Sequence, residues 1–246
     1  MRLAGKTAIV TGGGSGFGAG IARKFTAEGA KVIIADVDGD AAEAVAQEIG
    51  AAVQITDVAN ADSVEALAQK TRDEHGRLDI LVNNAGITHL PTAMEEVEEA
   101  LFDRVLAVNA KSVYLMARAF VPMMKAQGHG AILNIASTAG LSPRPRLTWY
   151  NASKGWMITA TKSMAVELAG DGIRVNALCP VAGETPLLKS FMGEDTPERR
   201  AAFLATIPIG RFSTPEDMGN AACYLCSDEA SMITGVAMEV DGGRCI

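Results

Sequence analysis

The chain has 246 residues, of which 48% are hydrophobic and 21% charged, a balance typical of globular proteins. Its length suits one α/β domain with a single large core, or at most two small domains. The formal net charge is −7 and no basic tail or cluster occurs, which argues against nucleic acid as a partner.

The N-terminus leads directly from Met1–Lys6 into a strand pattern, without the features of a signal peptide. No apolar run is long enough to span a bilayer, so we expect a cytoplasmic protein with no membrane partner. Strand and helix patterns alternate along the chain and no linker interrupts them. We therefore predict one domain over residues 1–246.

The first predicted strand, 7–10, is followed by the glycine-rich turn Thr11-Gly-Gly-Gly-Ser-Gly-Phe-Gly18 and by a helix that ends at Gly29. Glycines let a backbone approach a pyrophosphate, and a helix N-terminus supplies N–H donors and positive dipole. A glycine-rich turn without a ligand is the alternative, since the pattern alone is weak.

The second predicted strand, 31–36, ends in Asp36, 18 residues after Gly18. An acid there can accept hydrogen bonds from an adenosine ribose and repel a 2′-phosphate. Neither the glycine turn nor Val37 offers a basic side chain for such a phosphate. This arrangement favours NAD(H) over NADP(H).

The remaining elements continue the alternation. Helices are predicted over 39–49, 63–74, 94–125, 150–168 and 215–226, and strands over 52–56, 78–82, 131–136, 174–178 and 237–240. Residues 183–212 form the longest irregular stretch and carry apolar side chains such as Leu187, which suits a substrate lid. Asn109 is polar within the long helical region, and a buried Asn usually satisfies local backbone groups.

Tyr150 and Lys154 lie four residues apart on a predicted helix and so share one face. An ammonium about 4 Å from a phenolate contributes on the order of 4 kcal/mol, enough to lower a tyrosine pKa by up to ~3 units before desolvation opposes it. Ser137 follows a predicted strand and lies at the edge where α/β sheets bind ligands. These three residues could exchange a proton with a substrate oxygen, although a surface Tyr preceding a Lys is a frequent accident.

Four cysteines occur, including the pair Cys223-x-x-Cys226. No second pair and no nearby histidine accompany them, and the surrounding segment has helical periodicity. We interpret both as small core residues and predict no metal site.

In combination, these motifs resemble the short-chain dehydrogenase/reductase family from Lys6 to Gly243. The matching pieces are Thr11-Gly12-x-x-x-Gly16-x-Gly18, Asp36, Asp57, Asn83-Asn-Ala-Gly86, Asn109, Ser137, Tyr150-x-x-x-Lys154, and Pro180 with Thr185. The resemblance implies an α/β, doubly wound Rossmann-like fold with a parallel seven-stranded sheet in the order 3-2-1-4-5-6-7, flanked by helices. It also implies a homotetramer, paired through the two long helices after strands four and five.

The resemblance also implies roles for single residues. Tyr150 would exchange the proton, Ser137 would hold the substrate oxygen, Lys154 would bind the nicotinamide ribose and tune Tyr150, and Asn109 would hold a relay water. Cofactor contacts would come from Gly12, Ser15, Gly16, Phe17, Gly18, Asp36, Asp57, Val58, Asn84, Ala85, Gly86, Tyr150, Lys154, Pro180, Gly183 and Thr185. One segment departs from the family pattern, because Val181 replaces the usual Gly and Gly183 takes a position that is usually aliphatic.

We therefore expect an NAD(H)-dependent oxidoreductase that interconverts a secondary alcohol and a ketone. A 3-oxoacyl-[acyl-carrier-protein] reductase shares these motifs, but such reductases usually take NADPH and would need a basic patch for the carrier. A non-catalytic dinucleotide-binding scaffold or sensor is the alternative from another class.

The substrate is not specified by these motifs. Arg144 and Arg146 lie in the loop between Ser137 and Tyr150 and could bind an anionic group, with Leu187 also near the substrate. Arg199 and Arg200 could add a closing contact. Alternatively, these arginines are solvated or form surface ion pairs, which are worth little.

Seven apolar residues of the 94–125 region carry more apolar surface than one helix face packed against the sheet can bury. We expect them in a subunit interface: Phe102, Val105, Leu106, Tyr114, Leu115, Phe120 and Met123.

Overall fold

The strands form one parallel sheet. The computed structural model describes residues 1–246. Its strands are β1 (Thr7–Thr11), β2 (Lys31–Asp36), β3 (Ala52–Ile55), β4 (Ile80–Asn83), β5 (Gly130–Ile135), β6 (Ile173–Pro180) and β7 (Ala237–Val240). Their order in the sheet is 3-2-1-4-5-6-7 and every neighbouring pair is parallel, which confirms the predicted Rossmann-like fold.

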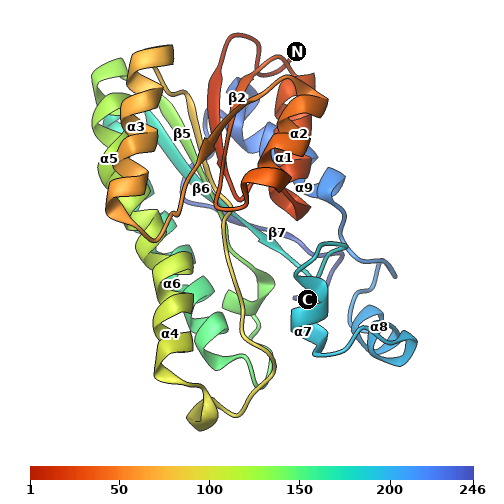
Figure 1. Cartoon of the computed structure of the whole chain (residues 1–246). Coiled ribbons are helices and arrows are strands. Elements are labelled where there is room, and N and C mark those ends of the chain that lie inside the picture. The colour runs from red at the N-terminus through yellow and green to blue at the C-terminus, as the bar shows by residue number, and fades with distance from the viewer.

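Helices cover both faces of this sheet (Figure 1). They are α1 (Gly16–Ala27), α2 (Gly39–Ile49), α3 (Ala61–His75), α4 (Glu99–Leu106), α5 (Ser112–Gln127), α6 (Thr148–Leu168), α7 (Leu188–Met192), α8 (Pro197–Leu204) and α9 (Pro215–Cys226). Helices α1, α2 and α9 pack on one face, and α3, α5 and α6 on the other. None of the helices combines the length and the apolar character needed to cross a membrane.

Alternating residues of the strands supply the two cores, because successive side chains of a strand point to opposite faces. In β1, Ala8 and Val10 pack towards α1, α2 and α9, while Ile9 packs towards α3 and α5. Ile9 lies in register with Ile33 of β2 and Leu81 of β4, and both belong to the second core. Both faces are thus buried, as parallel sheets require.

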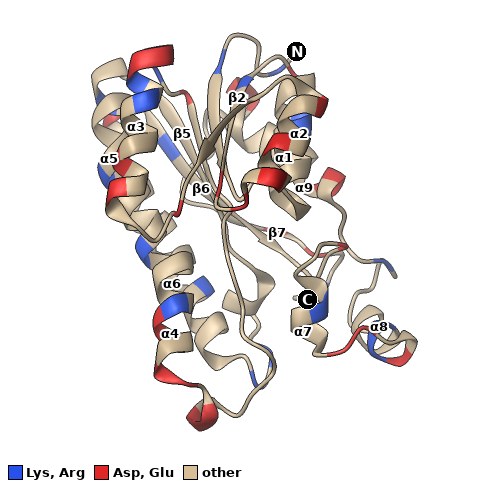
Figure 2. Ribbon diagram, viewed as in Figure 1, with Lys and Arg blue, Asp and Glu red and all other residues tan.

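The chain order reverses between β1 and β4, which are neighbours in the sheet. Ligands of doubly wound sheets bind beside such a switch point, at the carboxyl ends of the strands. Helices α4, α7 and α8 lie beyond that edge (Figure 1), and the last two belong to the predicted lid region. Charged residues lie mainly on helices and loops, and the central strands carry few (Figure 2).

The helical region predicted over 94–125 is found, with two departures from a regular α-helix: a 3₁₀ turn η1 (Met94–Glu96) precedes α4, and a π-helical turn η2 (Ala107–Lys111) joins α4 to α5. The expectation for its apolar residues was partly wrong. The supposed interface residues Val105, Leu115 and Phe120 are buried in the chain's own core. Of the large apolar residues on α5, Tyr114 is exposed.

Candidate active site

A cavity of about 400 Å³ opens at the carboxyl ends of the strands. Its walls come mainly from the segments that follow β1, β2, β3, β4, β5 and β6 and from the loop before α6. It brings together most of the residues expected from the sequence: Gly12, Ser15, Gly16, Phe17, Asp36, Asp57, Val58, Asn84, Ala85, Gly86, Ser137, Arg144, Tyr150, Lys154, Pro180, Gly183, Thr185 and Leu187. The volume is in the range of small-molecule sites.

The glycine turn and Asp36 form one end of this cavity. Asp36 Oδ2 accepts a hydrogen bond from Gly14 N at 2.9 Å, which fixes the carboxylate beside the turn. Asn84 Nδ2 donates to Thr11 O at 2.8 Å and ties the loop after β4 to the same turn. Gly18 lies behind the turn, not in the cavity wall, and a Cβ there would come within 2.1 Å of Gly12 O. The tight turn, the N-terminus of α1 and the acid together fit a dinucleotide with a free ribose.

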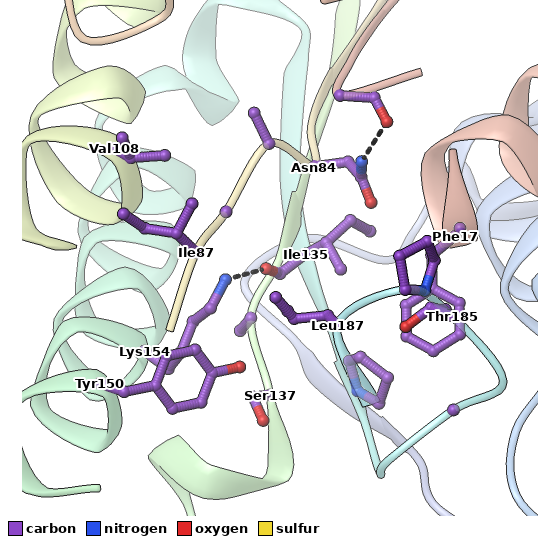
Figure 3. Close-up of a pocket in the computed structure, with 18 of the residues that line it drawn as sticks. Phe17, Asn84, Ile87, Val108, Ile135, Ser137, Tyr150, Lys154, Thr185 and Leu187 are labelled. Atoms are coloured by element: carbon purple, nitrogen blue, oxygen red, sulfur yellow. Dashed lines mark hydrogen bonds between the residues drawn. The ribbon is translucent and has the colours of Figure 1, made fainter. Parts of the chain in front are cut away.

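Tyr150, Ser137 and Lys154 form the inner end (Figure 3). Tyr150 and Lys154 lie on one face of α6 and are both 4% exposed, and Ser137 follows β5. Figure 3 shows the ring of Tyr150 beside Ser137 and Lys154. Lys154 Nζ donates to Ile135 O at 2.8 Å and lies 5.9 Å from the centre of the Tyr150 ring.

The expected lowering of the Tyr150 pKa is not found in this structure. Burial raises the pKa of the Tyr150 phenol to about 12, and the hydrogen bond with Ser137 opposes that shift. Burial also lowers the pKa of the Lys154 ammonium to about 8. Desolvation dominates because both groups are enclosed and the ammonium points at a carbonyl instead of at the phenolic oxygen.

Asn109 lies in the π-helical turn, outside the cavity wall. Its Oδ1 accepts from Ile87 N and its Nδ2 donates to Ile87 O, both at 2.9 Å. The same Nδ2 donates to Ser153 Oγ at 3.0 Å. Asn109 therefore holds the loop after β4 against α6, which is the local backbone role weighed in the sequence analysis.

The structure explains why a glycine stands at position 183, after β6, where the family pattern has an aliphatic residue. A Cβ on Gly183 would lie 2.3 Å from the Phe17 ring and 2.8 Å from Ser213 Oγ. The large Phe17 side chain thus takes the room that an aliphatic residue at position 183 would need. Val181 is buried among Leu188, Met192 and other side chains of the region that follows β6.

The two candidate arginines both belong to the loop before α6, but they lie in different surroundings. Arg144 lines the cavity, but Arg146 does not: it is exposed, has a φ of 64°, and directs Nε towards Pro91 O at 3.5 Å. Arg146 is therefore not one of the residues that line this cavity. Arg200 forms surface ion pairs with Asp195 and Glu184, the alternative considered for it.

The cavity also contains residues that the sequence analysis did not assign to the site: Val37, Thr56, Ile87, Arg104, Thr138, Leu147, Phe191 and Phe203. Val37 directly follows Asp36, so its position was open to inference. Phe191, whose ring centre lies 5.1 Å from that of Tyr150, and Phe203 come from α7 and α8. Their place depends on the path of the 183–212 segment, which carries no strong sequence signal.

Known proteins resemble this chain over its whole length. A family model described as enoyl-(acyl carrier protein) reductase matches residues 12–244. The 4-formylbenzenesulfonate dehydrogenase TsaC1/TsaC2 of Comamonas testosteroni is 47% identical over 100% of both chains.

Two solved structures have the same fold. A 3-ketoacyl-(acyl-carrier-protein) reductase from Brucella melitensis complexed with NADH is 50% identical, with a TM-score of 0.95 over 99% of this chain and 100% of that one. A 7α-hydroxysteroid dehydrogenase complexed with NADH and 7-oxo glycochenodeoxycholic acid is 36% identical, with a TM-score of 0.93 over 98% and 95%. Both complexes agree with the expected NAD(H) cofactor. The motifs, the sheet order and these relatives show that the chain belongs to the short-chain dehydrogenase/reductase family.

Proposed function

We propose that this protein is an NAD(H)-dependent oxidoreductase that interconverts a secondary alcohol and a ketone. One observation carries the proposal: a single cavity joins a dinucleotide-type turn with Asp36 to a buried Tyr150, Ser137 and Lys154. The dehydrogenase relative from Comamonas and the NADH complex from Brucella support the reaction class and the cofactor.

The cofactor would lie along the carboxyl edge of the sheet, from Asp36 to Lys154. When bound, it supplies the carbon that accepts or donates hydride. Asp36 would accept hydrogen bonds from the adenosine ribose, and Lys154 would donate to the second ribose once its ammonium is released from Ile135 O. The segment from Pro180 to Thr185 borders the same wall and would enclose the carboxamide end.

Tyr150 would give its phenolic proton to the carbonyl oxygen during reduction and take it back during oxidation. Burial raises the pKa of the phenol, so Tyr150 holds its proton at neutral pH for the reduction direction, whereas oxidation requires that pKa to be lowered towards neutrality. The hydroxyl of Ser137 would donate to the same substrate oxygen and hold it in line with Tyr150. Positioning by two hydroxyl groups lowers the orientation cost of the reaction. The segment 183–212 would act as a lid, since Leu187, Phe191 and Phe203 from this segment line the cavity.

The name of the Brucella neighbour favours a second candidate, reduction of a 3-oxoacyl group on acyl carrier protein. Asp36 supports NADH as the reductant in either case. The two candidates differ in the surface that they require. A free alcohol needs only the cavity, whereas a carrier-bound substrate also needs a cationic surface for the acidic carrier. A non-catalytic scaffold is less well supported, since every group that the chemistry needs lines one cavity.

A substrate panel tests the proposal. Secondary alcohols, polyols, hydroxy acids and 4-formylbenzenesulfonate are offered with NAD, and acetoacetyl-[acyl-carrier-protein] with NADH and with NADPH. An aldehyde belongs in the panel because its hydrate presents the same H–C–OH group as an alcohol. We expect turnover of a free alcohol with NAD. Turnover confined to the carrier substrate would favour the second candidate, and none with any compound would favour the scaffold.

We also propose a homotetramer built on α5 and α6. Tyr114 on α5 is 54% exposed, and Trp156 and Val166 on α6 are 44% and 85% exposed. These exposed apolar side chains lie on the two helices through which the family resemblance expects the subunits to pair. Light scattering at micromolar concentration should give four times the chain mass, and Val166→Glu should reduce it. A stable monomer would contradict this assembly.

A further inference from the structure

Two arginines that have no acidic partner lie close together at the loop before α6, and one of them, Arg144, lines the cavity. Arg144 belongs to the loop before α6 and lines the cavity, and Arg244 comes from the segment after β7. Neither guanidinium is among the twelve ion pairs of the chain, whereas Arg200 and Arg211 on the nearby surface each pair with a carboxylate. A nearby like charge disfavours the charged form of each group, and an anion bound between the two would relieve this repulsion.

Both guanidinium groups also keep buried donors without an acceptor in the protein. Arg144 Nη2 and Arg244 Nε are enclosed, and neither has a hydrogen-bond partner. The contact that Arg244 makes, from Nη1 to Ser142 Oγ at 3.3 Å, leaves Nε unused. Burial and then the charge of Arg244 lower the pKa of Arg144, which expresses the same unfavourable environment. An anion placed between the two side chains would accept these donors and neutralise the charge.

The surrounding structure holds Arg144 in a fixed orientation. Its backbone oxygen accepts from Asn151 Nδ2 at 2.7 Å, and Asn151 is the neighbour of Tyr150 on α6. Its guanidinium stacks on the Phe203 ring, with Cζ 4.5 Å from the ring centre. A planar cation held on an aromatic ring presents its edge to a ligand, which suits bidentate binding of a carboxylate or sulfonate.

The cavity wall beside Tyr150 is apolar. Leu147 and Phe191 line the cavity and pack with Tyr150 in one small cluster, in which the Phe191 ring lies edge-on to the Tyr150 ring. A ligand that spans the cavity would therefore carry its reacting oxygen at one end, an apolar body in the middle and an anion at the other end.

We propose that Arg144 and Arg244 form an anion subsite, and that the substrate is an alcohol or carbonyl compound with an apolar body and a terminal carboxylate or sulfonate. This inference rests on the proposed oxidoreductase function for the identity of the reacting group. The subsite itself is a claim about binding and can be tested without turnover.

Binding comes first, because it is independent of catalysis. Calorimetry on the NADH-saturated protein would use benzoate, benzenesulfonate and neutral benzyl alcohol as probes, with wild type and with Arg144→Met, Arg244→Met and Arg146→Met. Arg146 is the matched control because it occupies the same loop but lies outside the cavity. We expect the anions to bind at least about ten-fold more tightly than the neutral probe, and Arg144→Met to remove that preference.

Kinetics then identify the anion as part of the substrate. The compounds are 1-phenylethanol and its 4-carboxylate and 4-sulfonate derivatives, which share one reacting centre. The ratio of kcat/KM for the anionic over the neutral alcohol should fall at least about ten-fold in Arg144→Met, recover partly in Arg144→Lys, and stay unchanged in Arg146→Met. Comparison of kcat/KM for the carboxylate and the sulfonate derivatives shows which anion the site prefers.

The outcomes separate the two proposals. Anion binding that depends on Arg144, with no turnover of any alcohol, would support the subsite and count against the oxidoreductase function. Turnover with equal kcat/KM for neutral and anionic alcohols, and no loss of anion binding in either arginine variant, would overturn the subsite while leaving the oxidoreductase function intact.

Discussion

Replacing Asp36 by Asn should reverse much of the discrimination between the two dinucleotides. Asp36 lines the cavity and its carboxylate is fixed by Gly14 N at 2.9 Å and Asp38 N at 3.1 Å. Asparagine keeps the size and removes the negative charge; its oxygen can still accept from Gly14 N in the glycine turn, while the bond from Asp38 N is lost.

The magnitude follows from two effects of the charge. A hydrogen bond from a ribose hydroxyl to a carboxylate is worth about 1.5–3 kcal/mol, and much of this is lost with a neutral acceptor. Repulsion between the carboxylate and a 2′-phosphate about 6 Å away costs on the order of 3 kcal/mol per unit charge at an effective dielectric of 20. Together these effects predict a fall of at least about 100-fold in the NAD over NADP ratio of kcat/KM, since each 1.4 kcal/mol is a factor of ten.

The assay is steady-state kinetics with the best alcohol from the panel, with each cofactor varied separately. Asp40→Asn is the control, because it removes an exposed acid in the first turn of α2 that does not line the cavity. Its ratio should equal that of wild type. Preference of the wild type for NADP, or an unchanged ratio in Asp36→Asn, would refute the reasoning.

Two further predictions concern the inner end of the cavity and the turn at Gly183. Burial lowers the pKa of Lys154 to about 8, so between pH 8 and the ordinary lysine value the unfolded chain holds a proton that the folded chain has released, and stability should rise with pH in that window. The free energy of unfolding would be measured by urea unfolding of wild type and of Lys154→Met, without cofactor, at several pH values. The difference, wild type minus variant, should increase by up to about 3 kcal/mol between pH 8 and the ordinary lysine pKa. A difference that does not change with pH would contradict the burial of Lys154. Gly183→Ala should lower the melting temperature and weaken NADH binding, because its Cβ would meet the Phe17 ring at 2.3 Å, and the added change Phe17→Ala should restore much of both. Equal losses with and without Phe17 would show that the ring is not the cause.

Much of the fold follows from local sequence signals. Helix α9 begins at Pro215 as predicted, because Thr214 and Asp217 form a capping box before an apolar stretch. Strand β2 ends at Asp36 and strand β7 spans Ala237–Val240, also as predicted, since turn residues bound both. The sheet order came from the family resemblance and not from these local signals.

Some features depend on tertiary structure and had no local signal. The π-helical turn at Asn109 adds one residue to a helical stretch whose apolar pattern continues on both sides. The pKa of Tyr150 is set by how completely the phenol is enclosed, which the spacing of Tyr150 and Lys154 does not determine.

The positions of the two loop arginines also could not be predicted from the local sequence. Arg144 and Arg146 are separated by Pro145 alone, yet one turns towards the cavity and the other away from it. The positive φ of Arg146 produces this difference, and only the folded loop reveals it. The contact between Arg244 and the loop before α6 was not predicted, because the segment after β7 carries no motif that relates it to that loop.

The central claim is that the buried phenol of Tyr150 transfers the proton in an NAD(H)-dependent reaction. The most direct measurement compares wild type and Tyr150→Phe for NADH binding by calorimetry and for the rate of a single turnover with the best alcohol. The account predicts a similar dissociation constant for NADH and a rate reduced by roughly 10²–10⁴-fold, the range for loss of a general acid–base. Near-normal turnover in Tyr150→Phe with intact cofactor binding would contradict it.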